Sequence, residues 1–132
     1  MTPLQHLTAA EGWLELGNVE ESFKELEQLP SKAQQNADVI ALRVRGYHHA
    51  GKLDYGVLLA EILREHAPDR VPSEIAYDFA CQLCSDGKTK EAEQWLEVAF
   101  ANVGDMDESN ELRTRALDDP ALEPVWSEIG WV

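Results

Sequence analysis

The two cysteines of the chain, Cys81 and Cys84, are separated by two residues, a spacing found in redox-active pairs and in half of a zinc site. Together with the imidazole of His48 or His49, the two thiolates would give a mixed Cys and His ligand set for zinc. A small metal-binding or thiol-active protein is therefore one hypothesis for this sequence.

The predicted position of the cysteines within their helix disfavours that chemistry. Helical periodicity predicts a helix over residues 73–85, so Cys81 and Cys84 share one side of it and lie near its C-terminal end. A redox pair normally lies at a helix N-terminus, where the dipole lowers the thiol pKa. His48 and His49 diverge by about 100° around their own helix and cannot both bind one metal. We expect both cysteines to be reduced, metal-free and dispensable for folding.

Catalytic motifs are missing from the rest of the sequence. It contains no G-x-S-x-G, no glycine-rich phosphate loop and no H-E-x-x-H. Its carboxylates are scattered at helix-surface spacing, which is typical of solvated faces. The sequence thus predicts a protein that is not an enzyme and that uses no cofactor or metal ion.

The net charge limits the classes of partner. The 132 residues include 25 acidic and 11 basic side chains, which gives a formal net charge of −14. Such a chain repels phosphate backbones and anionic membrane surfaces, so we expect neither nucleic acid nor a membrane as a partner. The sequence has no signal-peptide pattern and no apolar run long enough to span a bilayer, and we expect a cytoplasmic location.

Three glycines, Gly17, Gly51 and Gly87, mark an internal repeat, with successive copies 34 and 36 residues apart. Four residues before each glycine the chain has a large apolar residue: Trp13, Tyr47 and Leu83. Five residues after each glycine it has a small one: Ser22, Gly56 and Ala92. A glycine can end one helix with a positive φ, and a small residue lets the next helix pack closely against it. The repeat therefore predicts pairs of antiparallel helices.

This pattern resembles the tetratricopeptide repeat, a helix-turn-helix unit of 34 residues. The third copy matches best, with Phe79, Ala80, Gly87, Ala92, Leu96 and Ala99 in the positions that the family favours. Arg43 and Gly56 depart from the family's preferences in the second copy, and Ser22 and Pro30 in the first. The resemblance implies an all-α fold, a right-handed superhelix of antiparallel helix pairs that forms one domain over residues 1–132. The repeats would cover about 3–35, 37–70 and 73–104, with a C-terminal helical cap over 105–132.

Local signals predict where the helices begin and end. Periodicity gives helices near 3–16, 19–28, 32–50, 53–66, 73–85, 89–102 and 108–117, with no competing strand pattern. Thr2 and Gln5 fit a capping box before the first helix, and Ser31 and Gln34 fit another before the third. In the tail, the apolar side chains expected to cover the end of the array are Leu112, Ala116, Leu122 and Trp126.

The resemblance also implies a function, because the first helix of each repeat in this family lines a concave groove that binds peptides. The residues at the matching positions are Leu7, Glu11, Leu14, Glu15, Arg45, His48, Tyr77, Asp78 and Cys81. The leucines would supply apolar contacts, Tyr77 an aromatic anchor, and the carboxylates an attraction for a basic partner. The leading hypothesis is a protein–protein interaction module that binds a partner protein or peptide in this groove.

Overall fold

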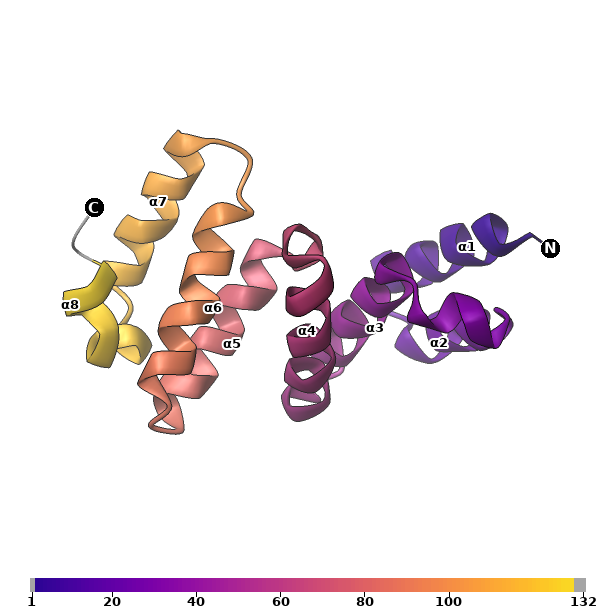
Figure 1. Ribbon diagram of the computed structural model, residues 1–132, viewed down its shortest axis with the longest axis horizontal. Helices are drawn as coiled ribbons and strands as arrows, with labels where there is room; N and C mark the ends of the chain where they lie inside the picture. The colour runs from indigo at the N-terminus through magenta and orange to yellow at the C-terminus, as the bar shows by residue number, and fades with distance from the viewer. Residues whose placement is uncertain (1, 130–132) are drawn as a thin grey trace. The chain divides into compact units, whose positions relative to one another are not determined.

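The computed structural model describes residues 2–129, and every regular element among them is helical (Figure 1). The prediction of an all-helical chain is confirmed for these residues. The chain divides into two compact units, one ending at Arg70 and the other beginning at Val71. That the repeats form one domain stays a prediction, and the predicted cap residues 130–132 lie outside the described part.

The N-terminal unit consists of two antiparallel helix pairs and two short 3-10 segments: α1 (Pro3–Glu15), α2 (Val19–Glu27), η1 (Ser31–Gln35), α3 (Ala37–His49), α4 (Leu53–His66) and η2 (Pro68–Arg70). Helix α1 packs against α2, and α3 packs against α4. Helices α2 and α1 both also contact α3, so the two pairs join along α3. The predicted boundaries of these helices agree with the observed ones to within two residues, except for the third.

The repeat glycines adopt the backbone conformation that the sequence predicts. Gly17, Gly51 and Gly87 have φ values of 78°, 75° and 80°. After each glycine, the next backbone N–H donates to the carbonyl five residues earlier, over 2.8 Å to Trp13, 2.9 Å to Tyr47 and 2.8 Å to Leu83. These are the bonds of a Schellman motif, which ends a helix on a left-handed glycine. The three copies therefore share the geometry of their turns as well as their residue types.

One of the two predicted capping boxes forms. Thr2 accepts from the backbone N–H of Gln5 at 3.2 Å, and its own N–H donates to the Gln5 side chain at 2.8 Å. At the second, Ser31 and Gln34 belong to η1, and α3 starts later, at Ala37, after the N-cap Asn36, whose side chain accepts from the backbone N–H of Asp38 at 2.8 Å. The Gln34 amide donates instead to the carbonyl of Leu26, near the end of α2, and to that of Leu29 just after it. The expected helix over 32–50 is therefore two elements.

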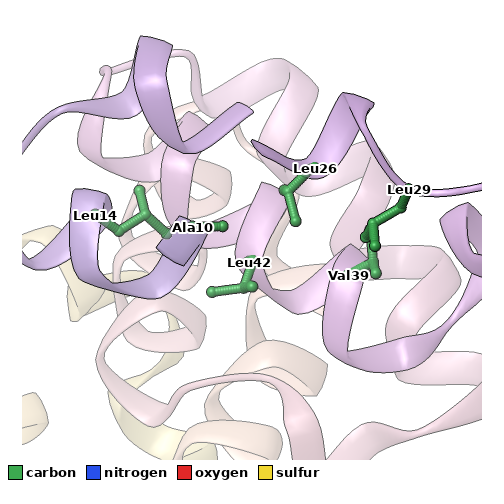
Figure 2. Close-up of a cluster of buried hydrophobic side chains, with 6 residues drawn as sticks. All are labelled: Ala10, Leu14, Leu26, Leu29, Val39 and Leu42. Atoms are coloured by element: carbon green, nitrogen blue, oxygen red, sulfur yellow. The ribbon is translucent and has the colours of Figure 1, made fainter. Parts of the chain in front are cut away.

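A cluster of buried hydrophobic side chains in the N-terminal unit lies between α1, α2 and α3 (Figure 2). Its buried members are Ala10, Leu14, Leu26, Leu29, Val39 and Leu42. The small residue of the first repeat, Ser22, is fully buried beside this core, and its hydroxyl donates to the carbonyl of Ala10 at 2.8 Å. That hydrogen bond satisfies a hydroxyl in a place where the repeat family has alanine.

The C-terminal unit is built on a third helix pair, α5 (Ser73–Ser85) and α6 (Thr89–Ala101). Between the two helices, the rings of Phe79 and Trp95 meet edge to face with centroids 5.5 Å apart, and Ala92 is fully buried. The chain then continues as α7 (Met106–Leu117), η3 (Pro120–Val125) and α8 (Trp126–Ile129).

These last elements pack on the third helix pair. Leu112, Ala116 and Leu122 are buried, and the indole N–H of Trp126 donates to the carbonyl of Ala116 at 2.8 Å. Segment η3 contacts both α5 and α6, which places it over the faces of the pair that would otherwise be exposed. The described part of residues 105–132 thus forms a helical cap on the third pair.

Candidate functional site

In the N-terminal unit, the residues predicted to line the groove lie on two neighbouring helices, α1 and α3. Glu11 on α1 and Arg45 on α3 form an ion pair, with 3.6 Å between Oε1 and Nη1. Their side chains are 55% and 34% exposed, so both remain accessible from solvent. Glu15 lies one turn after Glu11 and is exposed as well. The structure thus brings together a mostly acidic, accessible surface formed by Glu11, Glu15 and Arg45, here named the α1–α3 surface.

The two leucines predicted for this surface face inward. Leu14 is 8% exposed and belongs to the buried core together with Ala10, one turn earlier on the same side of α1 (Figure 2). Leu7 is partly buried and packs against the same core. The spacing of seven residues keeps Leu7 and Leu14 on one side of the helix, and that side is the one that the helix pair buries. The accessible part of α1 at this surface is therefore its carboxylates.

The histidines lie where helix physics favours them. His48 and His49 are in the last turn of α3, next to the negative end of the helix dipole. The ring of His49 lies against Gly17, since a Cβ at that glycine would come 3.3 Å from the imidazole Nε2. His48 is partly buried and takes part in an interaction within the chain. Of the two, the ring of His49 is the one that the structure places against α1's terminal turn, at Gly17.

In the C-terminal unit, Tyr77 is covered by the chain itself. Its side chain is 2% exposed, and its hydroxyl donates to Oδ2 of Asp119 at 2.8 Å. The guanidinium of Arg115 lies 4.3 Å from the centre of the Tyr77 ring and makes two hydrogen bonds, of 2.9 and 3.1 Å, to Glu74. Tyr77 was expected to be an exposed anchor, but in this structure it has no free surface for a partner.

The same carboxylate reaches Cys81, whose Sγ lies 3.8 Å from Oδ2 of Asp119. Burial and the charges of Asp119 and Asp78 raise the pKa of the Cys81 thiol to about 12. Burial, with a smaller contribution from Glu93, also raises the pKa of Cys84. A thiol with a raised pKa is protonated at neutral pH and is a poor nucleophile. Both cysteines are free in this structure, and their surroundings do not activate them.

Sequence reasoning missed Asp119 and Arg115 as neighbours of the predicted groove residues. Asp119 caps η3 by accepting from the backbone N–H of Ala121 at 3.0 Å. Its second role depends on a contact across 42 residues, for which a single sequence gives no signal. Asp78 lies on α5 beside these residues and is partly buried.

Three further observations concern metal ligands, membrane helices and hollows. Among residues 2–129, no three His, Cys, Asp or Glu side chains gather closely enough to hold a metal ion. No helix within that described range has the length and apolar character needed to cross a bilayer. A hollow of about 630 Å³ in the C-terminal unit is an open depression beside Cys84, walled by Pro120 and Pro124. It holds no charged group other than Glu123 and offers no evident catalytic arrangement.

Comparisons with known proteins return no relatives: no protein-family model, curated protein or solved structure matches this chain.

Proposed function

We propose that this chain is a tetratricopeptide-like protein–protein interaction module whose helix pairs stack as a right-handed superhelix. The observation that carries the proposal is the threefold recurrence of one turn, with a left-handed glycine and the same hydrogen bond at the same offset. Repeated helical hairpins of this kind have few internal sites for chemistry, and they present long rigid surfaces to other proteins. Rigid helices also keep the ordering cost of binding low.

The proposed binding site is the α1–α3 surface, the accessible remainder of the predicted groove. Glu11 and Glu15 are solvent-exposed carboxylates on one side of α1, and Arg45 neutralises only one of them. Such a surface favours a partner protein or peptide with a basic segment, which would compete with Arg45 for Glu11. Tyr77 is not proposed as a contact, because it is covered from within its own unit, and Cys81 is not proposed because it is only partly exposed and lies beside the Asp119 carboxylate.

A comparison of charge variants tests this proposal. The full-length chain is used as bait in lysate of its native cell, beside a Glu11→Lys/Glu15→Lys variant and a Glu20→Lys/Glu27→Lys variant. Glu20 and Glu27 are exposed carboxylates on α2, so both variants change the net charge equally. We expect a partner that binds the wild type and the α2 variant and is lost from the α1 variant.

Two results would contradict the proposal. A partner that both variants retain would bind somewhere other than the α1–α3 surface. A partner that both variants lose equally would respond to net charge alone, without a specific site. Quantitative mass spectrometry of the bound proteins distinguishes these outcomes, and circular dichroism checks that each variant keeps its helices.

A further inference from the structure

Helix α4 exposes a row of large apolar side chains. Tyr55, Leu58 and Ile62 are 60%, 65% and 46% exposed. They are three and four residues apart, so they lie on one side of the helix and form a continuous ridge. The opposite side is formed by Gly56, Ala60 and Leu63, which are buried. Single exposed apolar residues are normal on a protein surface, but a row at helical spacing indicates a contact surface.

The tyrosine of this ridge is held in position by other rings. Tyr55 lies against Tyr47 on α3, with centroids 5.6 Å apart. Tyr47 in turn meets the ring of Phe23 on α2 edge to face at 5.1 Å. An exposed aromatic ring that is already packed on one side loses little freedom when a partner covers the other. Tyr55 is therefore a preorganised anchor, of the kind that Tyr77 was expected to be.

One border of the ridge is acidic. Asp54, Glu61 and Glu65 recur at intervals of seven and four residues, which places them together along one edge of α4. Arg64, the cation nearest to this edge along the helix, lies 3.7 Å from Glu61 and is 24% exposed. The outward side of α4 thus has an apolar ridge beside a row of carboxylates.

We propose that this side of α4 docks an amphipathic helix of a partner protein, a helix with an apolar stripe and lysine or arginine along one border. The apolar stripe would cover Tyr55, Leu58 and Ile62, and the basic border would lie against Glu61 and Glu65. Charge complementarity selects this occupant over a second copy of the chain, because each copy has a net charge of −14. The ridge lies on a different helix from the α1–α3 surface, so this inference does not depend on the function proposed there.

A pair of synthetic peptides tests the proposed docking directly. The first is a helix of about four turns, matched to the length of α4, with leucines on one side and lysines along one border. The second has the same leucines and has glutamates in place of the lysines. Binding of each labelled peptide to the full-length chain is measured by fluorescence anisotropy. We expect the lysine peptide to bind at least about tenfold more tightly than the glutamate peptide.

Protein variants assign the binding to α4. Leu58→Gln/Ile62→Gln should weaken binding of the lysine peptide roughly tenfold or more, since the two substitutions remove apolar side chains from the ridge without changing the core. Its matched control is Leu16→Gln/Met106→Gln, which changes two exposed apolar residues elsewhere and should leave binding unchanged. Glu61→Lys/Glu65→Lys should reverse the preference toward the glutamate peptide. Circular dichroism confirms that each variant is folded.

Several outcomes would overturn the inference. Undetectable binding of the lysine peptide to the wild type would do so, as would equal binding of the two peptides. An equal loss of peptide binding in the Leu58→Gln/Ile62→Gln variant and in its control would show that exposed apolar residues contribute to binding without a specific site. A dimer in sedimentation that Leu58→Gln/Ile62→Gln dissociates would show that the occupant is a second copy of the chain.

Discussion

The hydroxyl of Tyr77 on α5 donates a 2.8 Å hydrogen bond to the carboxylate of Asp119, at the start of η3. This bond ties the C-terminal segment to the side of α5 on which the repeat spacing had placed a partner. Arg115 adds a second tie, since its guanidinium stacks on the Tyr77 ring and pairs with Glu74. The cap therefore closes part of the surface that the predicted groove would have used.

Removing the Tyr77 hydroxyl should destabilise the C-terminal unit. Tyr77→Phe keeps the ring but leaves the Asp119 carboxylate without its buried donor, which we expect to cost about 1–2 kcal/mol in the free energy of unfolding. Urea unfolding followed by circular dichroism measures the loss. Tyr55→Phe is the matched control, because Tyr55 is 60% exposed and the change should have little effect there. Equal changes in the free energy of unfolding of the two variants would show that the Tyr77–Asp119 hydrogen bond does not stabilise the protein.

Stability should fall at alkaline pH. Burial raises the pKa of Cys81 to about 12, from an ordinary value of 9.0, and raises the pKa of Tyr77 as well. Above pH 9 the unfolded chain therefore releases protons that the folded chain retains, and the free energy of unfolding decreases. Each group contributes a slope of at most about 1.4 kcal/mol per pH unit between its unfolded and folded pKa values.

The thiol part of this pH dependence can be separated from the tyrosine part. Cys81→Ser removes one of the two thiols that titrate near pH 9 in the unfolded chain, so the decrease between pH 9 and pH 10 should become shallower than in the wild type, with Cys84 contributing the thiol effect that remains. The decrease above pH 10, the ordinary pKa of tyrosine, should remain. Urea midpoints measured across this range test both statements. Identical curves for the wild type and Cys81→Ser would mean that the folded thiol titrates as it does in the unfolded chain.

The helices were predictable because their signals are local. Gly17, Gly51 and Gly87 end helices through their own backbone conformation, and Thr2 and Gln5 close a capping box within four residues. The error at Ser31 has the same origin, because a capping-box pattern is local and does not by itself decide whether the α-helix begins at that point. In the structure, the side chain of Asn36 caps α3. The Gln34 side chain is not part of a cap, because its amide donates to the carbonyl of Leu26, near the end of α2, at 2.6 Å.

The candidate site was predictable only where it depends on one helix and its nearest neighbour. Glu11 and Arg45 hold matching places in adjacent repeats, and the structure pairs them. The contacts of Tyr77 and Cys81 with Asp119 depend on how the tail folds back across about forty residues, which repeat spacing does not encode. The ridge on α4 was likewise missed, since exposed and buried apolar residues look alike in a sequence.

Ala92 tests the close approach of α5 and α6. It is fully buried at the position where the repeat requires a small residue. Ala92→Leu should lower the free energy of unfolding by about 1–3 kcal/mol, because the added atoms have no space between the helices. Lys90→Leu, at an exposed position on the same helix, should leave stability nearly unchanged. An unchanged urea midpoint for Ala92→Leu would show that the pair is not closely packed there.

Two helical glycines give a matched test of packing in the N-terminal unit. A Cβ at Gly46 on α3 would come 2.4 Å from Cε1 of Phe23 and 2.7 Å from its Cζ. A Cβ at Gly12 on α1 would meet no atom within 4 Å. Alanine favours a helix over glycine by roughly 0.5–1 kcal/mol, so Gly12→Ala should stabilise the protein by about that amount. Gly46→Ala gains the same preference but forces the Phe23 ring to move, and we expect a net loss of about 1–2 kcal/mol.

The double variant Gly46→Ala/Phe23→Leu identifies the cause of that loss. Leucine lacks the ring atoms that the new methyl group would meet, so the two substitutions together should cost less than the sum of their separate effects. Thermal and urea unfolding of the single and double variants give the coupling energy. Phe23 also supports Tyr47 and, through it, Tyr55, so Phe23→Leu alone should weaken binding of the lysine peptide at α4. Additive costs in the double variant would show that the Phe23 ring is not what makes Gly46 necessary.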